Sequence, residues 1–107
     1  MNYYHEEREL LLNYIHQGCH AGLIRLSAGN FSLKISDNLA AITPSGILYR
    51  VMGINDISIV DLEGNLIAGP TPSSETPMHT AIYRNIPRAI SICHTHSIYG
   101  MVFAMLG

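Results

Sequence analysis

The spacing of apolar residues in the second half of the chain limits its fold more than any other feature of the sequence. An apolar stripe of helical period, closed by Pro87, predicts a helix from about Glu75 to Ile86. The apolar run from Ala89 to Cys93 follows at once and predicts a strand. The helix therefore returns the chain to a sheet. Its inner stripe is expected to consist of Met78, Ala81, Ile82 and Ile86.

The rest of the chain predicts a second packing helix and a series of short strands. A one-sided apolar stripe predicts a helix over Glu6–His16, ended by Gly18 and Gly22. Glu63-Gly64-Asn65 lies between two apolar runs and predicts a hairpin. Strands are predicted at residues 31–35, 39–42, 57–62 and 66–68, and the apolar residues 101–106 predict the first turns of a further helix.

Length and composition exclude several classes of protein. A chain of 107 residues, 48% of them hydrophobic, allows one domain with a real core. The net charge of −2 and the scattered Lys and Arg form no basic stripe, so nucleic acid is not an expected partner. There is no apolar run of transmembrane length and no signal peptide, so we expect a soluble, cytoplasmic protein without a membrane partner. In that compartment Cys19 and Cys93 are expected to be free thiols.

Three polar turns interrupt the apolar framework, and each has the chemistry of an anion contact. Ser27–Asn30 and Thr43–Gly46 offer backbone N–H groups, small side chains and hydroxyls or an amide. Ser73 and Ser74 lie where the second helix begins, at the positive end of its dipole. Together the turns can hold a phosphate without Arg or Lys. Taken singly, each turn is better explained as an ordinary turn or a helix N-cap than as an anion contact.

Two histidines follow the apolar run that begins at Ala89. If the strand continues through His96, then His94 and His96 project from one face and can share a metal ion, while Cys93 points away. Two imidazoles on a rigid strand are half of a plausible zinc site. A His-x-His pair is weak evidence on its own.

Five motifs, in their order along the chain, resemble the class II aldolase/adducin family. The resemblance runs from about Glu7 to the last residue. It implies an α/β/α sandwich around a mainly antiparallel sheet, a catalytic zinc ion, and a homotetramer with active sites between neighbouring subunits. The motifs are Ser-Ala-Gly-Asn (27–30), Ile-Thr-Pro-Ser-Gly-Ile (42–47) with Tyr49 just after, Asp-Leu-Glu-Gly-Asn (61–65), Pro-Ser-Ser-Glu-Thr-Pro-Met-His (72–79) and His-Thr-His-Ser (94–97).

The resemblance also implies roles for individual residues. Glu75 matches the acid/base carboxylate, and His94 and His96 match two of three zinc-binding histidines. The positions that match phosphate-binding residues of the family are Asn30, Thr43, Gly46, Ser73 and Ser74.

The chain departs from the family pattern in what it lacks. A third histidine ligand and a C-terminal tyrosine that assists proton transfer belong to a second half, so we expect a truncated, N-terminal half-domain that is marginally stable or associates. His5, His16 and His20 match no metal position. His79 stands one helical turn after Glu75 and is expected to orient that carboxylate or to pack, rather than to bind metal.

The resemblance implies a zinc-dependent aldolase that cleaves a 2-ketose 1-phosphate, similar to L-fuculose 1-phosphate, into dihydroxyacetone phosphate and an aldehyde. Zinc stabilises the enediolate, and Glu75 carries the proton at carbon. The alternatives are a pentulose-phosphate 4-epimerase, a methylthioribulose-phosphate dehydratase, and a non-catalytic interaction module like that of adducin. Without the third ligand, turnover by the 107 residues alone is expected to be very slow or absent, whereas phosphate recognition is expected to survive better.

Overall fold

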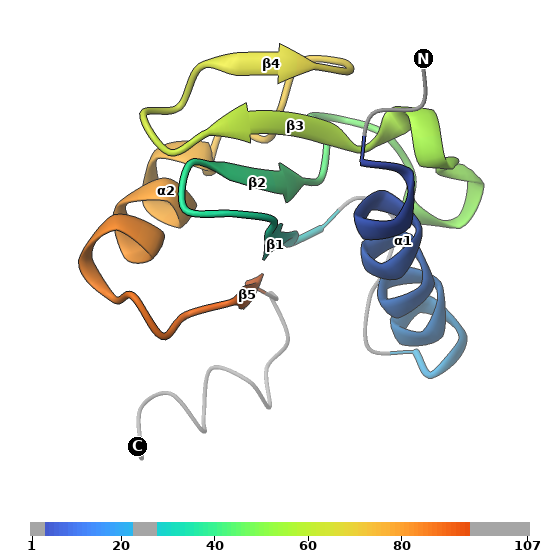
Figure 1. The fold of residues 1–107 in the computed structure, drawn as a ribbon. Coiled ribbons are helices and arrows are strands. Elements are labelled where there is room, and N and C mark those ends of the chain that lie inside the picture. Colours follow the sequence, from blue (N-terminus) through green and yellow to red (C-terminus); the bar gives the residue numbers. More distant parts are fainter. Residues whose placement is uncertain (1–3, 23–27, 95–107) are drawn as a thin grey trace.

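The computed structural model describes residues 4–22 and 28–94 and contains a five-stranded antiparallel sheet between two helices (Figure 1). This arrangement confirms the predicted α/β fold with a mainly antiparallel sheet. The predicted helix at 101–106 lies outside the described residues. The helices are α1 (His5–His20) and α2 (Thr76–Asn85), and the strands are β1 (Asn30–Lys34), β2 (Leu39–Ile42), β3 (Ser58–Asp61), β4 (Leu66–Ala68) and β5 (Ser91–His94), with 3-10 turns at Tyr49–Val51 and Ile54–Asp56.

The order of strands across the sheet is β4-β3-β2-β1-β5. The first four form a meander of neighbours in sequence, and α2 then carries the chain from one edge to the other, where β5 pairs with β1. The predicted hairpin between β3 and β4 is confirmed: one carboxylate oxygen of Asp61 accepts bonds from the N–H groups of Glu63 and Asn65, at 3.0 and 2.8 Å. The bonds from Asn65 lower the pKa of Asp61.

The face of the sheet that α1 covers is apolar. Alternate residues of β1, β2 and β3, among them Phe31 and Ile59, contact the buried side of α1, where Ile15 is 1% exposed. The helix continues past its predicted end because Gly18 is accommodated within it, and Gly22, with φ +75°, follows its last turn. The full apolar layer consists of Leu11, Leu12, Ile15, Cys19, Phe31, Ala41, Tyr49, Met52, Ile57 and Ile59.

The α2 face differs from the sequence prediction. A smaller apolar cluster lies there, with Val60 and Tyr83 among its members. However, the predicted inner stripe of α2 is wrong: Met78, Ala81 and Ile82 are only partly buried and Ile86 is 50% exposed. The buried residues of the helix are Thr76, His79, Thr80 and Tyr83. Polar side chains can occupy this face because most of their hydrogen bonds are made inside the protein.

The connection from β4 to α2 requires glycine at position 69. Its φ is +93°, and a Cβ at this position would lie 2.9 Å from the carbonyl oxygen of Ile57, so only glycine fits without a shift. Beyond it, Pro72 forms an isolated bridge with Pro44. Two of the predicted polar turns are thereby held side by side.

Cys19 is buried and Cys93 is exposed, and both are free thiols, as predicted. In the described part of the chain, the helices are too short or too polar to cross a membrane.

Candidate functional site

Two of the three polar turns are joined by backbone hydrogen bonds. The N–H of Ser45 donates to the carbonyl of Thr71, and the N–H of Ser73 donates to the carbonyl of Thr43, both at 3.0 Å. Segments separated by about a quarter of the chain therefore meet at one end of the sheet. The prediction that these turns could act together has a structural basis.

The third turn is attached to the same place through Thr43. This residue is fully buried; its N–H donates to the carbonyl of Phe31, and its hydroxyl oxygen accepts a bond from the N–H of Phe31 at 3.2 Å. The hydroxyl of Tyr49 donates to the carbonyl of Gly29 at 2.5 Å. Burial raises the pKa of Tyr49, so its hydroxyl keeps the proton that it donates. Gly29 and Asn30 are thus fixed beside Thr43. Gly46 is exposed, with φ +74°.

Ser73 and Ser74 precede α2 in a different way from the one predicted. The hydroxyl oxygen of Ser73 accepts a bond from the N–H of Glu75 at 3.1 Å, and its carbonyl accepts the N–H of Thr76. The N–H groups of Met78 and His79 donate to the carbonyl of Glu75. The N–H groups at the start of the helix are thus already hydrogen-bonded within the chain. The serine hydroxyls, each with a proton to donate, are the better anion contacts.

A chain of polar side chains connects α2, β1 and β5 below these turns. The hydroxyls of Tyr83 and Ser32 lie 2.7 Å apart, and the Ser32 oxygen lies 2.6 Å from Nδ1 of His79. Nε2 of His79 hydrogen-bonds with Oδ1 of Asn30. Nδ2 of Asn30 lies 3.3 Å from Nδ1 of His94. We call these five residues the polar chain.

Burial controls the protonation of the polar chain. It lowers the pKa of His79 to about 4, with a smaller contribution from the charge of nearby His94, and it raises the pKa of Tyr83 to about 12. At neutral pH, His79 is therefore a neutral imidazole and Tyr83 a neutral phenol. The interior of this face is polar but carries no net charge at these two groups.

The structure brings some of the predicted site residues together and leaves others apart. Asn30 and His94 are paired across β1 and β5 and hydrogen-bonded through their side chains. Glu75 is exposed just before α2, and within residues 28–94 no side-chain hydrogen bond joins it to His79. His96 lies outside the described residues, so the expectation that it shares a face with His94 stays a prediction. No group of three His, Cys, Asp or Glu side chains in the described ranges could hold a metal ion.

Sequence reasoning missed two members of the polar chain, Ser32 and Tyr83. Of the two roles expected for His79, packing in the interior is confirmed. A weak signal was present. Ser32 is two residues after Asn30 on a strand, and Tyr83 is four residues after His79 on a helix, so each pair shares a face.

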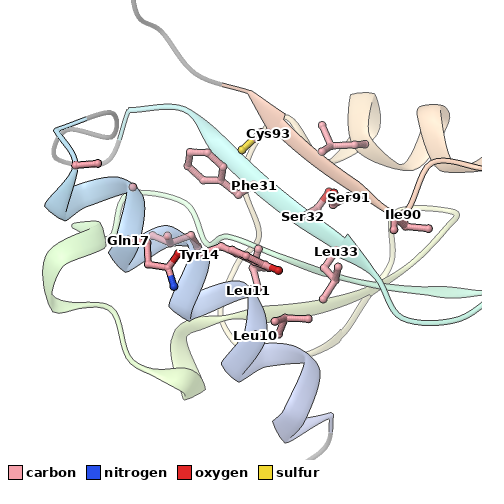
Figure 2. Close-up of a pocket in the computed structure, with 14 residues that line it drawn as sticks. Leu10, Leu11, Tyr14, Gln17, Phe31, Ser32, Leu33, Ile90, Ser91 and Cys93 are labelled. Carbon is pink, nitrogen blue, oxygen red and sulfur yellow. The ribbon is translucent and has the colours of Figure 1, made fainter.

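The opposite face of the sheet holds an apolar groove of about 710 Å³ between α1 and the strands β1 and β5 (Figure 2). Leu10 and Tyr14 of α1 line it together with Phe31, Leu33 and Cys93. Cys93 thus lies on the α1 side, whereas His94 bonds to Asn30, which contacts α2. The prediction that Cys93 points away from His94 is confirmed.

Comparison with known proteins gives consistent matches over nearly the whole chain. A family model described as "Class II Aldolase and Adducin N-terminal domain" matches residues 9–107. An L-fuculose phosphate aldolase of Methanococcus vannielii is 46% identical over 80 residues, which are 75% of this chain and 43% of that protein. A methylthioribulose-1-phosphate dehydratase of Xylella fastidiosa is 40% identical over 94 residues, 87% of this chain and 43% of that protein.

Among solved structures, one titled "L-fuculose 1-phosphate aldolase" superposes with a TM-score of 0.85 at 33% identity, covering 94% of this chain and 49% of that one. A second, "L-fuculose 1-phosphate aldolase from Glaciozyma antarctica PI12", gives a TM-score of 0.80 at 27% identity, covering 96% of this chain and 45% of that one. The chain therefore spans less than half the length of these relatives.

Proposed function

Because the chain belongs to the family of class II aldolase and adducin N-terminal domains, we propose that it forms the phosphate-binding half of a sugar-phosphate aldolase. The proposed reaction is cleavage of a 2-ketose 1-phosphate, similar to L-fuculose 1-phosphate, into dihydroxyacetone phosphate and an aldehyde. A homo-oligomer is proposed on the same family resemblance.

The observation that carries this proposal is the meeting of three polar turns above the polar chain. Bonds from Ser45 to Thr71 and from Ser73 to Thr43 hold the turns together. The site needs no Arg or Lys side chain in the turns, since hydroxyls, an amide and backbone N–H groups can bind phosphate. We assign the phosphate contacts to Asn30, Gly46, Ser73 and Ser74, with Thr43 fixed beneath them.

The metal assignment rests on a partial fit. Of the proposed ligands, His94 is described, half-buried and next to Asn30, and it is a suitable ligand by its chemistry. We propose that His94 and His96 hold a zinc ion, with the remaining ligands outside the described residues. Bound zinc would supply a Lewis acid for the substrate carbonyl.

The residues of the chain itself have three tasks in this proposal. Asn30 and the serine hydroxyls orient the substrate by its phosphate. The exposed carboxylate of Glu75, two residues after Ser73, moves a proton at the substrate carbon. His79 stays neutral and does not compete for that proton, because its pKa is about 4.

A dehydratase acting on methylthioribulose 1-phosphate is the second candidate, and the 40% identity to the Xylella protein favours it specifically. Both candidates require the same phosphate contacts. They differ in the bond that is broken, which the phosphate site does not determine.

The test is binding of phosphoglycolohydroxamate, an enediolate mimic with a phosphate group, in the presence of zinc. Replacing both Ser73 and Ser74 by Ala should weaken binding by about tenfold for each lost hydroxyl. Ser36→Ala is the matched control, because that exposed serine caps a turn elsewhere. Equal affinities of the wild type and the double variant, or absence of binding to a folded wild type, would refute the proposal.

Catalysis is tested separately by dihydroxyacetone phosphate release from L-fuculose 1-phosphate. We expect very slow or no release by the 107 residues. Measurable release that Glu75→Gln abolishes would show that this half alone assembles a working site. Binding without release is the expected result.

A further inference from the structure

The side-chain amide of Asn30 is held by its oxygen. Oδ1 of Asn30 carries no proton, so in its hydrogen bond with Nε2 of His79 the imidazole donates and the amide oxygen accepts. Both residues are buried, at 5% and 1% exposure, which leaves water little access to this bond. The amide therefore directs its oxygen towards α2 and its Nδ2–H₂ group away from His79.

A second bond holds the imidazole itself. Burial keeps His79 neutral, with a pKa of about 4, so the ring that donates from Nε2 accepts at Nδ1. The hydroxyl of Ser32 lies 2.6 Å from Nδ1 and donates to it, and the Ser32 oxygen lies 2.7 Å from the hydroxyl of Tyr83. Ser32 and Asn30 belong to the same strand, β1. His79 is thus fixed to that strand at both ring nitrogens.

The orientation of this amide decides what Asn30 can bind. An amide can present either an acceptor oxygen or two N–H donors, whereas a phosphate oxygen accepts hydrogen bonds and is repelled by another acceptor. With the amide oxygen bound to His79, the donors are left. Nδ2 carries two protons, and its contact with Nδ1 of His94, at 3.3 Å, can use only one of them.

We propose that His79 is a positioning residue for phosphate recognition: by holding the amide oxygen of Asn30, it makes Asn30 a contact that only donates. This inference rests on the proposed function, in which Asn30 is a phosphate contact, and it does not depend on a metal ion. It accounts for the selection of an anion by turns that contain no Arg or Lys. An amide able to turn over would accept from a ligand as readily as it donates.

The other buried polar residues of α2 show how His79 differs from a packing residue. The hydroxyl of Thr76 donates to the carbonyl of Ser73 at 2.6 Å, and the hydroxyl of Thr80 donates to the carbonyl of Thr76 at 3.1 Å. These bonds are local and position nothing on the sheet. His79 instead bonds to a side chain 49 residues earlier in the sequence, and a buried bond of that kind holds one defined geometry.

The test is binding of inorganic phosphate to the metal-free chain near neutral pH, followed by the backbone amide shifts of Ser73 and Ser74. Without metal, no effect of a variant can pass through a metal ion. His79→Leu should weaken binding by about tenfold, the effect of losing one hydrogen bond. In His79→Gln the new amide can still donate to Asn30, and the affinity should return to within about threefold of the wild type.

A double-mutant cycle shows whether His79 acts through Asn30. Asn30→Ala alone should also weaken binding by about tenfold. In that background His79→Leu should have no further effect, because no amide is left to orient. A second full loss, as independent sites give, would overturn the positioning role. So would a His79→Leu variant that binds phosphate as tightly as the wild type.

Two further variants separate positioning from loss of the fold. Ser32→Ala keeps the histidine but removes the donor to its Nδ1, and should weaken binding by about threefold. Thr80→Val removes a buried hydroxyl beside His79 that bonds to carbonyls of its own helix, and should leave the affinity unchanged. If His79→Leu does not fold, wild-type affinity in Ser32→Ala would overturn the proposal. Equal losses in Ser32→Ala and Thr80→Val would overturn it as well.

The double variant Ser73→Ala with Ser74→Ala separates this inference from the proposed function. If that variant loses phosphate while His79→Leu keeps it, only the positioning role fails. If the folded wild type does not bind phosphate, or the double serine variant binds it unchanged, the proposed phosphate site itself fails, and the role of His79 in recognition fails with it.

Discussion

The two faces of β1 are built from opposite kinds of contact. Phe31 faces α1 as a member of the apolar layer, and Leu33 packs against that layer. Asn30 and Ser32 face α2 and belong to the polar chain. Apolar packing is non-directional and scales with buried area, while hydrogen bonds between buried groups require defined positions. We conclude that the α1 face supplies most of the stability and that the α2 face positions the site.

The apolar groove and the polar turns lie on different sides of the molecule. The groove of about 710 Å³ is on the α1 side and its lining is mainly apolar. The three polar turns meet at the end of the sheet above the polar chain, near the N-terminal end of α2. The groove is suited to apolar groups, whereas the chemistry needed to hold a phosphate lies in the turns.

The largest effect should come from breaking the α1 face. Ile15→Ala removes a side chain that is 1% exposed and should lower the free energy of unfolding by about 3 kcal/mol. Tyr14→Ala, one residue earlier but 60% exposed, is the control and should cost well under half as much. Urea unfolding measures both. Equal losses would mean that the apolar layer does not support the fold as described.

The next effect concerns acid and the α2 face. Because the pKa of His79 is about 4 when folded and about 6.5 when unfolded, the unfolded chain binds the extra proton. The contribution of His79 to the free energy of unfolding is fully present above about pH 6.5. It falls by about 1.4 kcal/mol per pH unit as the pH is lowered towards 4. We expect a loss of about 2–3 kcal/mol between about pH 7 and pH 4.5 from this group.

His79→Gln is the comparison, because glutamine does not titrate. Its loss of stability over the same range should be smaller than that of the wild type by the amount just given. Asp61 does not interfere, since its lowered pKa confines its effect to a pH near and below its usual value of 3.8. Identical pH dependence of the two proteins would contradict a buried, neutral His79.

A smaller effect tests the link between the two faces. Tyr49 packs its ring edge-on against Phe31 in the apolar layer and donates its hydroxyl to Gly29, next to Asn30. Tyr49→Phe keeps the ring and should cost about 1 kcal/mol in urea unfolding. A cost near zero would mean that this bond does not help to hold the turn.

Much of the fold could be predicted because its patterns are local. The bounds of β2 and β4 match the predicted strands, and the helix predicted from about Glu75 to Ile86 differs from α2 by one residue at each end. The buried face of α2 was not predictable in the same way. Hydrophobicity selects Met78 and Ile82, whereas His79 is buried because a serine and an amide 47 and 49 residues away complete its hydrogen bonds.

The candidate site divides along the same line. Asn30 and His94 were identified singly, by motif, and the structure pairs them across β1 and β5. The polar chain joins Ser32 to His79 and Tyr83, which lie 47 and 51 residues further along the sequence, and these contacts form only in the folded interior.

The central claim, that ligand binds at the polar turns and not in the apolar groove, is tested most directly by backbone amide shift mapping. The ¹⁵N-labelled chain is titrated with phosphoglycolohydroxamate in the presence of zinc. The account predicts the largest shifts at Gly46, Ser73 and Ser74, with little change at Leu11 and Tyr14. Shifts confined to the residues that line the groove would contradict it.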